Sequence, residues 1–208
     1  LDHDIRQQIV AQFRELQRAF QLTAIAVTHH HEEASILGDR VAVMMDGRLL
    51  QIDKPSILFA QPASLRIAQF LRLRNLFPVE QIEARPGEWL CRIHGVDFAV
   101  RPPAGGAPRG SWFAWLPPGE IALRPGQNAA GAASQHPACV MEIIREGLQP
   151  FVRLRVGGER GPVLDSALLP HMLRGGGPAA GDQIQAGLHP EAIALFPDDR
   201  DDAADVSG

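Results

Sequence analysis

The stretch Thr23–Ile52, "TAIAVTHHHEEASILGDRVAVMMDGRLLQI", decides the fold of the first part of the chain. Its opening apolar run, residues 23–27, predicts a buried strand of a parallel sheet, because both faces of such strands are covered. A short helix is expected over residues 32–37, ended by Gly38. Asp46-Gly47 stands between two apolar runs and predicts a β-hairpin, since this dipeptide suits a turn with positive φ. Helix and strand signals therefore alternate, as in an α/β protein.

Helical periodicity extends this pattern on both sides. The preceding segment, residues 4–20, is predicted to be an amphipathic helix whose apolar side chains recur at helical spacing: Ile5, Ile9, Phe13, Leu16 and Phe20. Pro55 is expected to open a helical turn, and residues 64–71 form a second helix with one apolar face. We expect the α/β part to end near Asn75.

The pattern changes to short strands from Val79 onward. Segments that alternate apolar and polar residues are separated by Gly- and Pro-containing turns, which predicts an all-β barrel or sandwich over residues 76–197. The final segment, residues 198–208, is acidic and polar and is expected to be disordered. The chain is therefore predicted to be a multi-domain α+β protein with a truncated α/β piece at its start.

One internal repeat lies within the β-rich part. "LPPGEIALRP" at residues 116–125 matches "LHPEAIALFP" at residues 188–197, at a spacing of 72 residues. Two related β-units would produce such a pair. Chance similarity in a chain rich in Ala, Leu and Pro is the alternative.

The amino-acid composition limits the classes of partner and the cellular compartment that can be considered. The chain has 208 residues, 45% of them hydrophobic, and a formal net charge of −4, so nothing favours a general electrostatic interaction with nucleic acid. Cys91 and Cys139 lie far apart, outside any metal-type spacing, and a reducing compartment is the default. No apolar run approaches the ~20 residues that span a bilayer, and no signal peptide is recognised. The first residue is not Met, so we expect a piece of a longer protein.

The three consecutive histidines, His29 to His31, are poorly spaced for a metal. Side chains alternate along a strand and point about 100° apart on a helix, so neighbouring residues do not converge on one ion. A solvated polar loop is one alternative. The other is a single functional histidine, because the segment follows the carboxyl end of the predicted strand, where ligands bind in open α/β sheets.

The frame around the histidines resembles the C-terminal end of an importer-type ATP-binding cassette ATPase over about residues 1–75. Matching positions occur in the family's order: Val27, Thr28, His29, Glu33, Ala34, Asp39, Arg40, Met44, Gly47, Arg48, Gln51, Pro55, Phe70, Leu71 and Asn75. The resemblance implies that His29 is the catalytic switch histidine, which reaches the γ-phosphate and the attacking water. It also implies that Leu1-Asp2 ends the D-loop, with Asp2 at the nucleotide-sandwiching dimer interface. His30 and Asp53 depart from the family, which has Asp and Gly there.

The family's other nucleotide-binding motifs are missing from the sequence. It contains no G-x-x-x-x-G-K-S/T loop, no LSGGQ-like signature, and no apolar strand that ends in Asp-Glu. We therefore expect ATP and Mg²⁺ to bind the intact parent protein. For the 208-residue chain alone we expect no cofactor-binding residues, no metal site and no ATPase activity, because phosphate and metal binders are essential to phosphoryl transfer.

The β-rich remainder resembles the transport-associated OB (TOBE) domain that follows importer ATPase cores. Pro190 and Glu191 fit the Pro-Glu element of that family, whereas Pro117 and Gly119 depart from it. Such elements are expected to be structural turns. Trp112, Phe113 and Trp115 are candidates for a nucleic-acid stacking platform, but few basic residues flank them, so core packing is favoured and no nucleic-acid partner is expected. Four scattered histidines are expected on the surface or in turns: His94, His136, His171 and His189.

The resemblance implies a C-terminal fragment of the ATP-hydrolysing subunit of a bacterial importer. Its expected partners are a second ATPase subunit, in a homodimer, and membrane permease subunits, which places it in the cytoplasm at the inner face of the membrane. A ligand-sensing OB-type module for a small anion or for the transported solute is the alternative. Metal binding through His29–His31 is a third possibility, which their spacing disfavours. The solute itself is not specified by the sequence.

Overall fold

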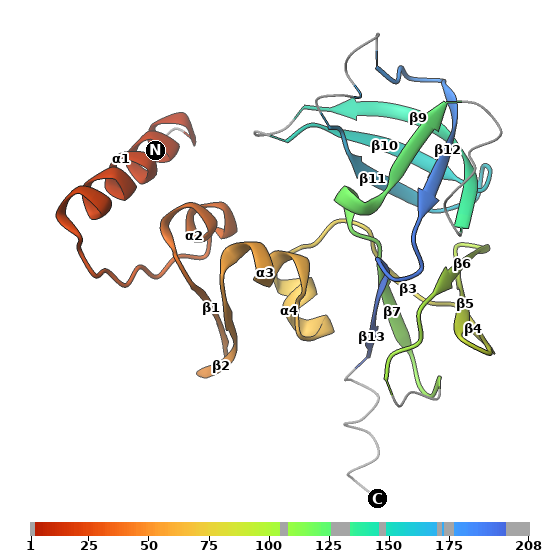
Figure 1. The fold of residues 1–208 in the computed structure, drawn as a ribbon, viewed down its shortest axis with the longest axis horizontal. Coiled ribbons are helices and arrows are strands. Elements are labelled where there is room, and N and C mark those ends of the chain that lie inside the picture. The colour runs from red at the N-terminus through yellow and green to blue at the C-terminus, as the bar shows by residue number, and fades with distance from the viewer. Residues whose placement is uncertain are drawn as a thin grey trace, which may run out of the picture. The chain divides into compact units, whose positions relative to one another are not determined.

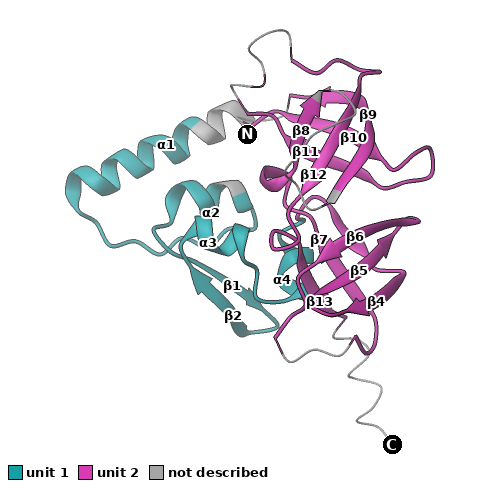
Figure 2. Ribbon diagram, turned by 45° about the vertical axis from the view of Figure 1, so that its right-hand side comes forward, with its two compact units in different colours: residues 1–72 teal, residues 73–208 magenta. Residues whose placement is uncertain are grey.

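The computed structural model describes residues 3–104, 108–125, 134–145, 149–169, 172 and 177–198. The chain divides into two compact units, residues 1–72 and 73–208 (Figure 2). The first unit carries helices and one hairpin, and the second is built from strands (Figure 1). The assignment of residues 1–75, 76–197 and 198–208 to three functional parts stays a prediction. Most of the expected disordered tail, residues 199–208, lies outside the described residues.

The helices of the first unit lie where periodicity predicts them. They are α1 (His3–Phe20), α2 (His31–Leu37), α3 (Pro55–Ala60) and α4 (Leu65–Phe70). Pro55 occupies the first turn of α3, where its missing N–H costs no hydrogen bond. Ser64 caps α4, since its Oγ accepts a hydrogen bond from the backbone N–H of Ile67 at 3.4 Å.

The predicted hairpin is also confirmed. Strand β1 (Val41–Met45) pairs antiparallel with β2 (Arg48–Asp53). The two turn residues, Asp46 and Gly47, have φ of 49° and 72°. Both values lie in the left-handed region that a tight two-residue hairpin turn requires, which explains why Asp-Gly occurs there.

The prediction of a buried parallel strand over residues 23–27 is wrong. This segment has no regular secondary structure, and the side chains of Ile25 and Val27 are 95% and 97% exposed. A parallel strand is stable only when neighbouring strands take up its backbone hydrogen bonds. In the described part of the first unit, the strands β1 and β2 pair only with each other. The apolar run indicates that this segment favours burial, but no strand in the described part of the unit pairs with it.

The second unit is mostly β, as predicted for the part that follows the α/β piece. Its strands are β3 (Leu76–Pro78), β4 (Gln81–Arg85), β5 (Glu88–Ile93), β6 (Val96–Val100), β7 (Trp112–Trp115), β8 (Ala122–Pro125), β9 (Ser134–Ile144), β10 (Phe151–Val156), β11 (Val163–Ala167), β12 (Gln183–Leu188) and β13 (Ala194–Pro197). They form a five-stranded sheet in the order β11-β10-β9-β12-β8 and two three-stranded sheets, β13-β7-β3 and β4-β5-β6. Neighbouring strands are antiparallel throughout these described sheets.

One hydrophobic core joins these sheets. Residues from β5, β6, β7, β9, β10, β11 and β12 contribute to it. Trp112 is 9% exposed and belongs to this core, which confirms its predicted role in core packing, whereas Trp115 is 4% exposed outside this core and Phe113 is half-buried. The indole N–H groups of the two tryptophans donate to the carbonyl oxygens of Arg109 and Arg74 at 2.9 and 3.0 Å. Buried indoles are stable when the N–H finds such a partner.

The two copies of the internal repeat have the same local structure. Each begins with a fully buried leucine, Leu116 or Leu188, and has a buried isoleucine five residues later. Between these positions the chain makes an equivalent turn in both copies. The N–H of Glu120 donates to the Pro117 carbonyl at 3.0 Å, and the N–H of Ala192 donates to the His189 carbonyl at 2.9 Å. The element that contains Pro190 and Glu191 is therefore a structural turn, as predicted.

The repeat also explains how the sheets are connected. The first copy follows β7 and leads into β8, which pairs with β12 of the five-stranded sheet. The second copy follows β12 and leads into β13, which pairs with β7. Each copy thus carries the chain from one sheet into the other, and the two crossings are reciprocal. This shared role favours two related β-units over chance similarity.

Candidate functional site

The three histidines lie at the junction between the extended segment and α2. His29 is exposed, whereas His30 is half-buried and occupies the N-cap of α2 with φ −95° and ψ 110°. His31 begins the helix, and its ring lies edge-on to the ring of Phe70 at 5.1 Å. The three side chains therefore have different surroundings. Within the described ranges, no three His, Cys, Asp or Glu side chains are grouped so that they could hold a metal ion.

A closed hydrogen-bonded turn surrounds His29. The backbone N–H of His30 donates to Thr28 Oγ1 at 3.0 Å, and the Thr28 hydroxyl donates to Glu33 Oε2 at 2.7 Å. His30 makes no side-chain capping bond of its own. The centroids of the His29 and His30 rings are 4.1 Å apart, with the planes tilted by 40°. The exposed imidazole of His29 is thus carried by a turn whose two ends are tied together.

A second set of contacts attaches α1 to the end of α2. Arg14 donates to the Leu37 carbonyl and to Gln17 Oε1, both at 2.8 Å, and forms an ion pair with Asp39. The hydrogen bond from Arg14 lowers the pKa of Asp39, with a smaller contribution from the charge of the guanidinium. Asp39 is one of the positions that match the ATPase frame, and its visible role here is structural.

Gln51 is another matched position with a structural role. Its amide donates to the Gln61 carbonyl and to Asp53 Oδ2, both at 3.1 Å, and its Oε1 accepts from the N–H of Ala63 at 2.9 Å. The side chain therefore connects β2 to the loop between α3 and α4. Asp53, which stands where the family has Gly, is a partner in this set of bonds. Asp2 lies outside the described residues, so its predicted role at a dimer interface stays a prediction.

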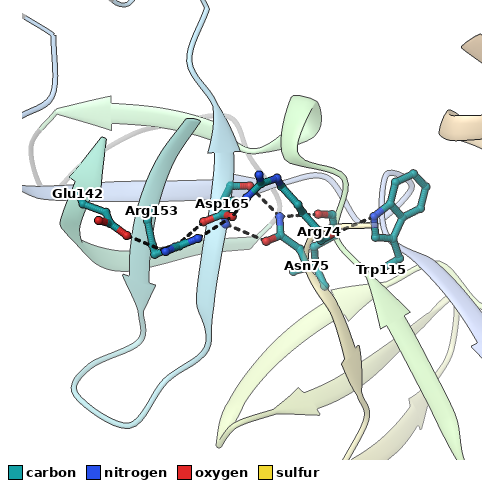
Figure 3. A network of polar contacts seen from close by, with 7 residues as sticks. Arg74, Asn75, Trp115, Glu142, Arg153 and Asp165 are labelled. Atoms are coloured by element: carbon teal, nitrogen blue, oxygen red, sulfur yellow. Dashed lines mark hydrogen bonds and ion pairs between the residues drawn. The ribbon is translucent and has the colours of Figure 1, made fainter. Parts of the chain in front are cut away.

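A buried polar network in the second unit was not found from the sequence (Figure 3). Asp165 is 7% exposed and accepts hydrogen bonds from Arg74 Nη1 at 2.6 Å and from Arg153 Nε at 2.8 Å. Arg153 also donates to Glu142 Oε1 at 2.6 Å. Burial by itself would raise the pKa of Asp165, but the hydrogen bonds from Arg153 and Arg74 outweigh burial and lower it. The carboxylate is thus held in its charged form.

Asn75 forms the centre of this network. Its amide donates to the carbonyls of Leu116 and Asp165 at 2.9 and 2.8 Å, and its Oδ1 accepts from the N–H of Asp165 at 2.7 Å. The residue has φ of 60°, a conformation that Asn tolerates better than most residues. It therefore joins the start of β3 to the end of β7 and to β11. These partners are 41 and 90 residues away along the chain, and no local sequence pattern indicates such pairings.

Of the four scattered histidines, two are exposed as predicted, one lies outside the described residues, and one lies against the core. His94 and His189 are exposed, as predicted, and His171 lies outside the described residues. The expectation that His136 is a surface or turn residue is wrong. It lies in β9, its ring is 4.5 Å from the ring of Phe98, and its Nε2 is buried without a partner among the described atoms. Alternation along a long strand turned this residue toward the core.

Comparisons with known proteins identify relatives of this chain. No family model matches the chain. Over about 60% of its length the chain is nevertheless homologous to ATP-binding subunits of ATP-binding cassette importers.

Three relatives illustrate the degree of similarity and the share of each protein that is matched. An "Fe(3+) ions import ATP-binding protein FbpC" of Rhizobium etli is 36% identical over 135 residues, which is 65% of this chain and 36% of that protein. The FbpC of Brucella abortus is 36% identical over 125 residues, 60% of this chain and 33% of that protein. A "Spermidine/putrescine import ATP-binding protein PotA" of Nitratidesulfovibrio vulgaris is 38% identical over 103 residues, 49% of this chain and 28% of that protein. The chain thus spans about a third of the length of the curated relatives it matches.

The fold was also compared with solved structures, and the helices were examined for the ability to span a membrane. The cytoplasmic molybdate-binding protein ModG aligns with a TM-score of 0.47 and 16% identity, over 60% of this chain and 96% of that one. Among the helices in the described residues, none combines the length and apolar character required to cross a bilayer.

Proposed function

We propose that this chain is the C-terminal part of the ATP-hydrolysing subunit of a bacterial importer. The observation that carries the proposal is the 36% identity over 135 residues with an import ATP-binding protein, together with the ordered match around His29. In this proposal the intact subunit binds ATP and Mg²⁺ and pairs with a second copy. It works at the cytoplasmic face of the membrane with permease subunits. Because the relatives' names include both iron and polyamines, the proposal names no solute.

His29 is the residue through which this chain would take part in hydrolysis. Its imidazole is exposed, and the turn that carries it is closed by the hydrogen bonds of Thr28. A side chain in this position can offer a hydrogen-bond donor to the γ-phosphate or to the attacking water. Phosphoryl transfer is catalysed largely by such positioning and by electrostatic stabilisation of the transferring group. The chemistry of the reaction would be completed by the phosphate and metal binders of the intact subunit.

The second unit is proposed to be an OB-type accessory domain. Its mostly antiparallel β structure and its five-stranded sheet support this assignment. In the described part of this unit, the buried charge of Asp165 is already paired with the half-buried arginines Arg153 and Arg74. Nothing in that network therefore favours the alternative, a ligand-sensing module for a small anion or the solute.

The test of this proposal is mutation of each histidine in the intact subunit. His29→Ala should lower ATP turnover by on the order of 10²–10³, as loss of one preorganised donor does elsewhere. His30→Ala and His31→Ala are the matched controls and should keep most of the activity. The purified 208-residue chain should show no turnover. A subunit in which His30→Ala is more damaging than His29→Ala, or turnover by the 208-residue chain, would overturn the assignment.

A further inference from the structure

The hydroxyl of Thr28 forms two hydrogen bonds, and both partners lie after His29 in the sequence. It accepts from the N–H of His30, two residues ahead, and donates to the carboxylate of Glu33 in the first turn of α2. Thr28 and Glu33 are half-buried, whereas His29 between them is exposed. The side chain at the centre of the turn is therefore free to meet a ligand, while its backbone is restrained from both sides.

These bonds restrict the direction in which His29 can point. A bond from residue i+2 back to a threonine hydroxyl fixes the backbone of the intervening residue, which here is His29. The bond from the hydroxyl to a carboxylate is charge-assisted and therefore stronger than a bond between neutral groups. It also ties the turn to α2, whose backbone is itself hydrogen-bonded from Ala34 N–H to the His30 carbonyl at 3.1 Å. The backbone that carries the imidazole of His29 is thus held in place.

We propose that Thr28 and Glu33 are positioning residues for His29. The inference rests on the proposed function, in which His29 contacts the γ-phosphate, and it adds two residues that act on His29 through hydrogen bonds within the chain. Glu33 acts through Thr28, and Thr28 acts through the backbone of His29. A displacement of about 1 Å at a catalytic group can cost as much as ~10²-fold in rate, so a pair that fixes this backbone has a measurable effect.

Four variants of the intact ATPase test the pair. Thr28→Val keeps the shape of the side chain but removes both hydrogen bonds, and Glu33→Ala removes the acceptor. Thr28→Ser and Glu33→Gln are the matched conservative variants, since each retains a group that can make the bond. We expect Thr28→Val and Glu33→Ala to lower kcat by roughly tenfold or more with little change in the KM for ATP. The conservative variants should keep most of the activity.

A double-mutant cycle separates positioning from a purely structural role. If Thr28 acts through His29, then Thr28→Val should have little further effect on kcat in a His29→Ala background, because residues in one unit have non-additive effects. A purely structural role would give the same fold-change in both backgrounds, and that result would overturn the inference. Loss of activity on Thr28→Ser equal to that on Thr28→Val would also overturn it.

The cycle distinguishes this inference from the proposed function. If His29→Ala leaves turnover unchanged, the proposed role of His29 fails. If His29→Ala lowers turnover but neither Thr28→Val nor Glu33→Ala lowers it, only the positioning role fails.

A structural readout in the intact subunit complements the activity measurements. Amide hydrogen exchange of His30 should be faster in Thr28→Val than in Thr28→Ser, since the hydroxyl is the acceptor of that N–H. Equal exchange rates in the two variants would contradict the geometry on which the inference depends.

Discussion

At the scale of single residues, His136 links the stability of the second unit to pH. Burial lowers the pKa of this imidazole, and the nearby charge of Asp97 opposes that effect only in part. Asp97 is itself ion-paired with Arg92 at 2.7 Å. As the pH falls below the ordinary value of 6.5, the unfolded chain takes up this proton before the folded chain does. The free energy of unfolding should therefore decrease from pH 7 toward pH 5.

Substitution of His136 tests this prediction. His136→Phe removes the titrating group and keeps an aromatic ring against Phe98, so the dependence of stability on pH should become flatter between pH 7 and 5. Urea unfolding followed by tryptophan fluorescence is a suitable measurement, because all 3 tryptophans lie in the second unit. His94→Asn, at an exposed position with φ of 46°, is the matched control. A profile that flattens equally in both variants would contradict the assignment to His136.

At the scale of elements, Asn75 connects β3 and β7 of one three-stranded sheet to β11 of the five-stranded sheet. Its side chain satisfies backbone groups next to β7 and within β11 while its own backbone leads into β3. Asn75→Ala should lower the free energy of unfolding by at least about 3 kcal/mol, because it leaves two backbone carbonyls and one N–H without this partner, and each such buried group costs about 1–3 kcal/mol. Urea unfolding of the second unit measures this change.

A glycine variant separates hydrogen bonding from backbone strain at this position. Asn75→Gly loses the same hydrogen bonds but adopts the left-handed backbone, φ 60°, without steric cost. We expect it to be destabilised as well, though less than Asn75→Ala. Stability equal to that of the unchanged chain would show that the conformation, rather than the bonds, is what Asn75 contributes.

At the scale of the whole molecule, the first unit leaves much of its apolar surface uncovered. Large apolar side chains of α1 and the segment after it are 44% to 97% exposed: Ile9, Phe13, Leu16, Phe20, Leu22, Ile25 and Val27. Patches of this kind promote association. We predict that the 208-residue chain self-associates or is partly disordered in this unit, and that the intact subunit proposed above buries the same side chains.

Light scattering over a range of concentrations checks this prediction. Leu16→Glu combined with Phe20→Glu should reduce the association of the 208-residue chain. Met141→Glu, at a position 40% exposed in the second unit, is the matched control and should leave association unchanged. A strict monomer, with slow hydrogen exchange throughout residues 4–71, would contradict the prediction.

Features that depend on neighbours along the chain were determined by the sequence itself. The periodicity of apolar residues predicts α1, and Asp46-Gly47 predicts the β1–β2 turn, because both depend on local backbone preferences. The ordered match around His29 likewise indicates the class of relatives without any structure. The repeat at residues 116–125 and 188–197 is visible in the sequence, but its role as a pair of reciprocal crossings is not.

Only the tertiary structure decided which residues meet across the chain. It showed that residues 23–27 have no partner strand in the described unit, that β9 turns His136 inward, and that Arg74 reaches Asp165 across 91 positions. The physical reason is that strand pairing, burial and ion pairing depend on groups brought together from distant positions. A local pattern states what a segment prefers, and the folded chain determines whether that preference is met.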